Sequence, residues 1–154
     1  MASPTAGALT VAQAMADFTA KRLTQAVVVE DSQDNLQANL ANLQKLAAAG
    51  KLSALSFTGN DSSLQFNAAQ INTSSALLSK AVASGVTVKV ADNAANTARM
   101  ASRISSVFDV TVTDTAANVE KNLTSLQTLA VTGKLDALSF TDNAPALTFK
   151  ANQF

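Results

Sequence analysis

The fold is decided by the stretch VVVEDSQDNLQANLANLQKLAAAGKLSALSFTGNDSSLQFNAAQ, residues 27–70. This stretch returns at residues 110–153, at a constant offset and without a gap, and 23 of the 44 aligned pairs are identical. A third, partial copy at residues 88–96 repeats the pattern V-x-V-x-D-x-x-x-N. Self-similarity of this kind is the signature of a repeat architecture, so the chain is interpreted as a duplicated unit.

Each full copy predicts a strand, a helix and two further strands. Val27 and Val29 alternate with side chains of the opposite face, which indicates a short strand. Apolar residues then recur every three or four positions, as on one face of a helix, and Gly50 predicts the end of that helix. The apolar stripe consists of Leu36, Leu40, Leu43 and Leu46, and in the second copy of Val119, Leu123, Leu126 and Leu129. Apolar alternation at 55–57 and 64–66 predicts the other two strands.

An aspartate stands at the same place in all three copies, after the strand and before the helix. Asp31, Asp92 and Asp114 are therefore predicted to be helix N-caps, whose carboxylates accept the first free backbone N–H groups. Ser32 and Asn93 are the neighbouring alternatives. These three aspartates are thus predicted to be structural residues.

Further helices and strands surround the two copies. Residues 71–84 predict a helix that leads to a strand at 86–90, and a helix after Asn93 leads into the strand at 110–112. Thr10 and Gln13 fit a capping box for a helix through Val11, Met15 and Phe18. The predicted order is α-β-α-β-β-α-β-α-β-α-β-β.

Strands that alternate with helices favour parallel pairing through right-handed crossovers. Parallel pairing within a repeat predicts an α/β solenoid, a stack of short parallel strands and helices like that of leucine-rich repeats. A compact three-layer α/β domain fits the same pattern. The turn residues at 58–63 and 141–146 suit either a hairpin or a step between two sheets, and the sequence does not distinguish them.

The composition excludes several classes of function. Charged residues make up 14% of the 154 residues, eleven basic side chains balance eleven acidic ones, and His, Cys, Trp and Tyr are absent. These absences remove the usual Cys/His zinc sites, thiol nucleophiles and Ser-His-Asp triads, so we predict a protein that is not an enzyme, with no catalytic residue and no cofactor. A net charge of zero predicts no nucleic-acid partner, and no apolar stretch is long enough for membrane insertion.

Two groups of polar residues are weaker candidates for a specific role. The turns with Asn60 and Asp61, and with Asp142 and Asn143, hold enough oxygen atoms for weak calcium binding, although turn chemistry explains the same residues. Asn35 and Asn39, with their counterparts Asn118 and Asn122, would form either a hydrogen-bonded ladder through stacked repeats or an ordinary polar surface.

The pattern V-x-V-x-D-x-A-A-N, a leucine-striped helix ending in Gly-Lys-Leu, and A-L-S-F-T-D-N resembles degenerate repeats of large secreted proteobacterial surface proteins of the adhesin-like type. The resemblance covers 27–70 and 88–153, and it implies a secreted structural or adhesive role. This chain lacks the G-G-x-G-x-D nonapeptide that such proteins also carry, so their calcium chemistry is not implied. Residues 1–10 lack the basic and apolar regions of a cleaved signal peptide, which predicts an extracellular or cell-surface protein exported without one.

The two ends of the sequence predict self-assembly. Phe154 aligns with Ile71, and the helix that follows Ile71 in the first copy has the same length as the helix expected at 11–26. The helix of one molecule would therefore continue the repeat of another, head-to-tail, in an open filament. The predicted interface consists of Val11, Met15, Phe18, Leu147, Phe149 and Phe154.

These expectations define a domain plan and a function. Residues 1–10 are a flexible arm and 11–154 a single α/β repeat domain. We predict a non-enzymatic structural protein that assembles into extracellular filaments or a surface layer. The alternative is a monomeric secreted module that binds a glycan or calcium.

Overall fold

A computed structural model of the chain describes residues 7–143 and 146–147. The chain divides into two compact units, Met1–Leu64 with Ser74–Val88, and Gln65–Thr73 with Lys89–Phe154. Each unit is described by itself. The predicted arm, 1–10, lies mostly outside the described residues, and the prediction of a single domain over 11–154 stays a prediction.

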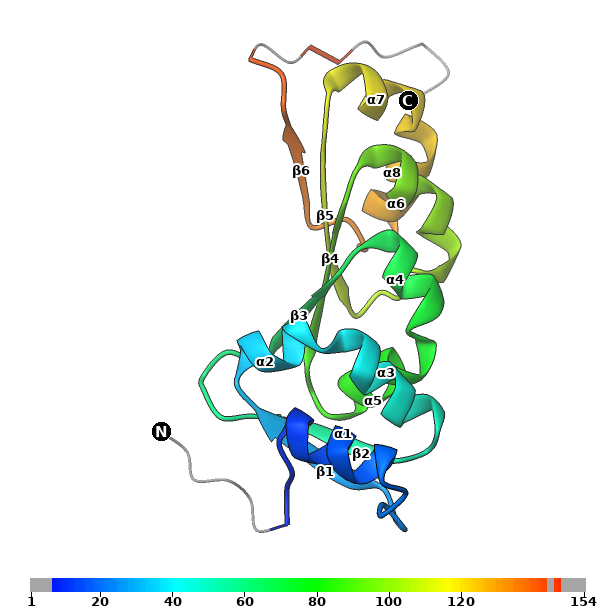
Figure 1. Cartoon of the computed structure of the whole chain (residues 1–154). Coiled ribbons are helices and arrows are strands. Elements are labelled where there is room, and N and C mark those ends of the chain that lie inside the picture. Colours follow the sequence, from blue (N-terminus) through cyan, green and yellow to red (C-terminus); the bar gives the residue numbers. More distant parts are fainter. Residues whose placement is uncertain (1–6, 144–145, 148–154) are drawn as a thin grey trace. The chain divides into compact units, whose positions relative to one another are not determined.

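Helices and strands follow one another in nearly the predicted order (Figure 1). The elements are α1 (Val11–Thr19), β1 (Val27–Asp31), α2 (Gln33–Ala38), α3 (Leu40–Ala48), β2 (Leu52–Phe57), β3 (Ser63–Phe66), α4 (Ala68–Thr73), α5 (Ser75–Ala83), β4 (Thr87–Asp92), α6 (Ala94–Met100), the 3-10 helix η1 (Ala101–Arg103), β5 (Phe108–Asp114), α7 (Ala116–Lys121), α8 (Leu123–Val131) and β6 (Ala137–Phe140). The strand predicted around Leu147 and Phe149 falls largely outside the described residues. No described helix has the length and apolar character of a membrane span.

The strands form two sheets, β1-β2 and β3-β4-β5-β6. The pairs β1-β2 and β5-β6 are both parallel, which confirms the α/β class with parallel strands. The two pairs have the same register once the copies are aligned, because Val29 pairs with Leu55 and Val112 pairs with Leu138 across adjacent strands. Because β2 and β3 belong to different sheets, the turn between them is a step from one sheet to the next, and the hairpin interpretation is wrong for this turn.

A short extended segment at Leu9 lies along the free edge of β1. Leu9 donates its backbone N–H to the Val28 carbonyl and accepts the N–H of Glu30, as in a parallel pair. The first sheet therefore begins before α1. Residues 9 and 10 are ordered parts of the first unit and not part of a flexible arm.

The helix expected at 11–26 ends early, at Thr19, and three other long predicted helices are each broken into two. Asn39 separates α2 from α3 and Asn122 separates α7 from α8, with nearly equal backbone angles (φ −116°, ψ 22° and φ −110°, ψ 9°). Ser74 makes the same break between α4 and α5. The side chains of Asn39 and Asn122 donate back to the carbonyls of Asn35 and Asn118, which satisfies acceptors exposed at the break.

Helices α1, α3 and α5 pack in sequence in the first unit, and α4, α6 and α8 in the second. Figure 1 shows the helices of the second unit on one side of its strands. The apolar stripes predicted from the sequence face the strands, with Leu36, Leu43 and Leu46 fully buried in one copy and Leu126 and Leu129 in the other. Gly50 and Gly133 end their helices with φ of 67° and 68°, as predicted.

Thr97 interrupts the apolar pattern at the repeat position held by Leu36 and Val119. Thr97 is 0% exposed, and its Oγ1 lacks a hydrogen-bond partner within the described part of the chain. Replacing a buried, unpaired hydroxyl with a methyl of the same shape removes a desolvation cost. We expect Thr97→Val to raise the free energy of unfolding by about 1 kcal/mol in urea titrations.

Thr97→Ser is the control for this prediction. It keeps the hydroxyl and loses a buried methyl, so it should be destabilised by about 0.8 kcal/mol. A Thr97→Val variant less stable than the wild type would mean that the hydroxyl has a stabilising partner.

Candidate functional site

The three strand-end aspartates share one set of local hydrogen bonds. Asp31 Oδ1 accepts the N–H of Ser32 at 2.9 Å and the side-chain amide of Asn35 at 2.7 Å. Asp92 Oδ1 accepts the N–H of Asn93 at 2.8 Å and the side-chain amide of Asn96 at 2.9 Å. Asp114 Oδ1 accepts the N–H of Thr115 at 2.8 Å and the side-chain amide of Asn118 at 2.7 Å. The Asn35 and Asn118 amides are thus bound within their own copies, so the predicted ladder of asparagines between repeats is wrong.

The other carboxylate oxygen reaches the helix that precedes the strand. Asp31 Oδ2 accepts the N–H of Val11 at 3.1 Å, which is the first residue of α1. Asp92 accepts the N–H of Ala68 at 2.9 Å, and Asp114 that of Ala94 at 3.0 Å. We call this arrangement a carboxylate clamp, because one aspartate joins the start of one helix to the start of the next.

The predicted N-caps are therefore displaced by one residue. The N-cap residues are Ser32, Asn93 and Thr115, whose side chains accept the N–H three positions on. Asp31, Asp92 and Asp114 stand just before the caps. Serine and asparagine are as good as aspartate at an N-cap and threonine is somewhat weaker, so these residues can cap the helix while the carboxylate bonds the more distant one.

Asp142 also holds the start of a helix, which sequence analysis did not recognise, although in the described residues it is bonded to that one helix only. Both of its carboxylate oxygens lie 3.1 Å from the N–H of Ala116, the first residue of α7. The signal was present, because Leu138, Phe140 and Asp142 repeat the apolar-x-apolar-x-Asp spacing of the other strands. Asp142 was predicted to be a candidate calcium ligand. Both of its carboxylate oxygens already accept a hydrogen bond from the start of α7.

Three carboxyl groups, those of Asp31, Asp92 and Asp114, have a pKa below the ordinary value of an aspartate. Partial desolvation acts to raise the pKa of Asp31 and of Asp92, but hydrogen bonds from an asparagine side chain and two backbone N–H groups outweigh it. Hydrogen bonding from Asn118 is the largest influence on Asp114, whose pKa also lies below its ordinary value. The clamps thus favour the ionised form.

Acid should weaken the protein through these groups. A carboxyl group with a lowered pKa contributes its full stability above the pKa of the unfolded chain, about 3.9, and loses it as the pH falls toward the folded value. We expect the urea midpoint to be constant between about pH 7 and pH 5 and to fall steeply below about pH 4. A midpoint that stays level down to pH 3 would contradict the clamp description, and the Asp114→Asn variant should show a smaller acid loss than the wild type.

The start of α2 lacks an aspartate bond of this kind, because Gly59 stands at the position where that aspartate would be. It follows Gln33, the first residue of α2, at the same separation along the chain at which Asp142 follows Ala116, the first residue of α7. Gly59 and Gln33 line the same hollow, and no described atom lies within 4 Å of a Cβ built on Gly59. An aspartate at position 59 would therefore supply the missing bond.

We expect Gly59→Asp to raise the free energy of unfolding by about 0.5–1 kcal/mol, because a new carboxylate meets the start of α2 and the unfolded chain loses freedom. Gly59→Asn is the matched control, since it has the same shape without the charge and should gain less. Thermal unfolding at pH 7 and pH 3 measures both, and the gain from aspartate should shrink at pH 3.

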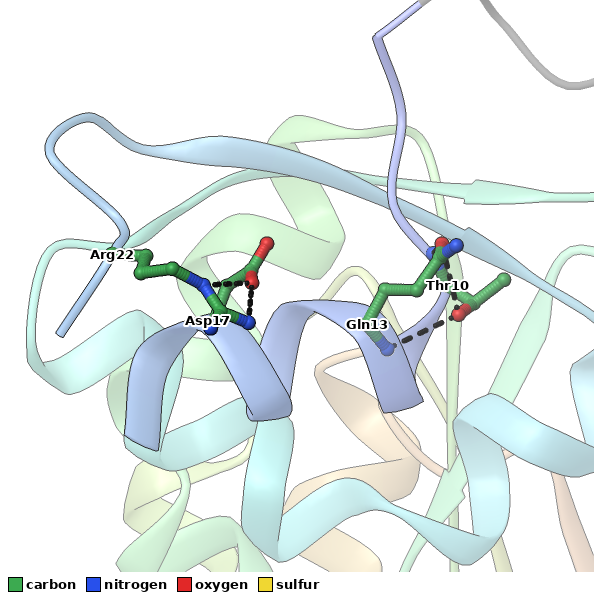
Figure 2. Close-up of polar contacts among 4 residues, drawn as sticks. All are labelled: Thr10, Gln13, Asp17 and Arg22. Carbon is green, nitrogen blue, oxygen red and sulfur yellow. Dashed lines mark hydrogen bonds and ion pairs between the residues drawn. The ribbon is translucent and has the colours of Figure 1, made fainter. Parts of the chain in front are cut away.

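Helices that follow a strand without an aspartate use a capping box (Figure 2). At α1 the Thr10 hydroxyl accepts the N–H of Gln13, and the Gln13 Oε1 accepts the N–H of Thr10. Asn67 and Gln70 exchange the same bonds before α4. The capping box predicted at Thr10 is confirmed, and its counterpart at Asn67 was missed. One box lies at α1, the first helix of the chain, and the other at α4, the helix that follows the first strand of the second sheet.

The calcium candidates lie on exposed turns. Asn60 and Asp61 line an open hollow of about 450 Å³ together with Asp34 and the Thr58 turn. Asn143 is exposed in the second copy. Among residues 7–143 and 146–147, no three acidic side chains converge in a way that would hold a metal ion.

The predicted assembly residues have different surroundings. Val11 is 3% exposed, and α1 packs against α3 and β1 of its own chain, so Val11 is not available to a second molecule. Met15, Phe18 and Leu147 are half-buried. Phe149 and Phe154 lie outside the described residues. The head-to-tail order of assembly stays a prediction.

Comparisons with protein-family models, with curated proteins and with solved structures found no match to this chain.

Proposed function

We propose that this protein is a non-enzymatic structural protein that assembles with copies of itself into filaments or a surface layer outside the cell. The observation that carries the proposal is the succession of contacts, in which helices pack mainly on their neighbours in the rows α1–α3–α5 and α4–α6–α8. Such nearest-neighbour packing suits a solenoid-like stack, an architecture that grows by adding like units to one another.

The carboxylate clamps support the same proposal. Each of the three clamps, at Asp31, Asp92 and Asp114, fixes the start of one helix to the start of the next through a hydrogen bond of 2.9–3.1 Å. A building block of a filament or layer must keep its shape under load. The clamps add to the rigidity that the buried apolar side chains give.

The composition favours a structural role at the cell surface. A chain without His, Cys, Trp or Tyr has few of the side chains that perform catalysis, and the lack of cysteine suits export as well as a reducing cytosol. Charged residues are scarce, at 14%, and the two signs balance, so that copies do not repel one another over long distances.

Sedimentation velocity and negative-stain electron microscopy of the purified chain test the proposal. We expect the weight-average mass to rise above the 15.8 kDa of the monomer with protein concentration and ordered assemblies to appear on the grid. Both measurements are made with calcium and with a chelator. The mass of a monomer at every concentration, in both solutions, would overturn the proposal.

The open hollow at the Thr58–Asp61 turn favours a second candidate, a monomeric module that binds calcium or a glycan. The carboxylates of Asp34 and Asp61 and the amide of Asn60 supply oxygen atoms on one side of it. Calorimetric titration with calcium, and a glycan array, test this candidate. Binding that is lost in Asp61→Asn and retained in Asp109→Asn, an exposed aspartate elsewhere, would support it.

A further inference from the structure

A groove lies between α4 and α6 in the second unit, where these two helices pack on each other. Its volume is about 380 Å³, and small or flexible apolar side chains share its wall with polar ones. The apolar side chains are those of Ala68, Ala69 and Met100, and the polar ones are those of Asn72, Thr73, Asn96 and Arg99. An apolar wall with a few polar groups is typical of sites that bind small molecules.

Two of the three arginines of the chain stand at this groove. Arg99 lines it, and its Nη2 donates to the Oδ1 of Asn96 at 2.6 Å. Arg103 follows four residues later, about one helical turn along, and its Nη1 donates to the Oδ1 of Asn72, another residue of the wall. Both guanidinium groups are thus held at the groove by neutral amides of its own wall.

Neither of these arginines is neutralised by an ion pair with a described carboxylate. The ion pair found within the described part of the chain joins Arg22 to Asp17, in the first unit. Asp92 interacts electrostatically with Arg99, but its two oxygens already accept hydrogen bonds from two backbone N–H groups and an asparagine side chain. Two guanidinium groups and one carboxylate leave the groove with an excess of one positive charge.

The equivalent groove in the first unit lacks the arginines. There α1 takes the place of α4 and lines a hollow of about 230 Å³, and no cation is among its described lining residues. The positions equivalent to Arg99 and Arg103 are Ala38 and Asn42. Because the helices of the first unit pack with neutral side chains at these positions, the fold does not require the two arginines. Like charges one helical turn apart also repel each other, which favours a binding role over a structural one.

We propose that the α4–α6 groove binds a sugar that carries a carboxylate, such as a hexuronate unit of an acidic polysaccharide. The carboxylate lies between Arg99 and Arg103, because a guanidinium group presents paired N–H donors that match the two oxygens of a carboxylate. Hydroxyl groups of the sugar hydrogen-bond with Asn72 and Thr73, and the C–H face of the ring packs on Met100 and the alanines. This site is independent of the proposed self-assembly and of the hollow at the Thr58–Asp61 turn.

Two features favour a sugar acid over other anions. An excess of one positive charge matches a monoanion, whereas a phosphate ester carries nearly two negative charges at neutral pH. The amide and hydroxyl groups beside the arginines suit a ligand with several hydroxyl groups. The chain as a whole has no net charge, so it lacks a long-range field that would attract a nucleic acid.

Protection of the arginines from phenylglyoxal tests the site in the wild-type protein. The reagent modifies guanidinium groups, and Arg22, which follows α1, is the internal control. We expect trigalacturonate, at about ten times its dissociation constant, to slow the modification of Arg99 and Arg103 about tenfold and to leave that of Arg22 unchanged. Tandem mass spectrometry gives the rate at each residue. Unchanged rates at Arg99 and Arg103 would overturn the inference.

The methyl ester of trigalacturonate is the matched control ligand, because it keeps the rings and hydroxyl groups and removes the charge. We expect it to protect neither arginine of the groove. Sodium acetate and inorganic phosphate, at the same concentration, are the other controls. Protection by either of them as strong as that by trigalacturonate would establish a general anion site and overturn the assignment to a sugar acid.

Calorimetric titration of variants measures the contribution of each arginine. Arg99→Gln and Arg103→Gln keep a hydrogen-bonding side chain without the charge, and we expect each to weaken trigalacturonate binding about tenfold. Lys89→Gln removes an exposed cation from β4, and Asp61→Asn changes the turn of the first unit, so both should bind like the wild type.

The outcomes separate this inference from the proposed function. Wild-type affinity in a variant that carries both Arg99→Gln and Arg103→Gln would overturn the inference, whether or not the chain assembles. Loss of binding in Asp61→Asn but not in the arginine variants would move the glycan site to the turn, which also overturns it. Because both arginines are exposed, the variants should keep the far-UV circular dichroism of the wild type, and the protection experiment needs no variant.

Discussion

Asp114→Ala should lower the free energy of unfolding by about 2–4 kcal/mol, a large part of the stability of a small domain. The change removes the acceptor of three hydrogen bonds, from the backbone of Thr115, the backbone of Ala94 and the side chain of Asn118. Hydrogen bonds to a charged group are worth about 1.5–3 kcal/mol each when buried and less where solvent competes. Urea titration monitored by far-UV circular dichroism measures the loss.

Asp109→Ala is the control on the same strand. Asp109 is exposed near the start of β5, and its replacement should change the free energy of unfolding by less than about 0.5 kcal/mol. Equal losses for the two variants would mean that the clamp adds nothing beyond the removal of an ordinary aspartate. Asp114→Asn should fall between them, because it keeps one acceptor oxygen without the charge.

Leu129→Ala should be at least as damaging, with an expected loss of about 2–5 kcal/mol. Leu129 is 1% exposed in the last turn of α8, and its removal leaves a cavity beneath the helix in addition to the lost transfer free energy. The spread reflects how far the surrounding side chains can close the space. Chemical denaturation at pH 7 gives the value.

Val131→Ala, two residues further along the same helix, is its counterpart. Val131 is 81% exposed, so the same kind of truncation should change stability by no more than about 0.5 kcal/mol. If Val131→Ala were as destabilising as Leu129→Ala, the assignment of the buried face of α8 would be wrong. Both variants are measured at a concentration at which the chain is monomeric.

Local patterns in the sequence predicted the elements well. Alternating apolar residues such as Val27 and Val29 identified strands, and Gly50 identified the end of a helix. Both signals are short-range, because a strand alternates with a period of two and a helix end needs a residue that tolerates a positive φ. The breaks at Asn39 and Asn122 were not predicted, because the apolar stripe continues across each asparagine without interruption.

The role of the aspartates could not be predicted in the same way. Asp31 and Ser32 are adjacent and both suit an N-cap, so local propensity does not choose between them. Asp31 instead accepts the N–H of Val11, which lies 20 residues earlier in the chain, at 3.1 Å, and this leaves the N-cap to Ser32. The buried Thr97 is another such case, because nothing in its neighbours distinguishes it from an exposed threonine of a helix.

The clamps have a consequence for the way the chain acquires its structure. Each of the three clamps joins residues only 20 to 24 positions apart, and strands β1 and β2 are joined across a similarly short span. Low contact order of this kind is associated with rapid folding, because little chain entropy is lost before a contact forms. A helix start would thus be secured as soon as the next strand end has emerged, which allows the protein to fold progressively from its N-terminus while it is still being synthesised.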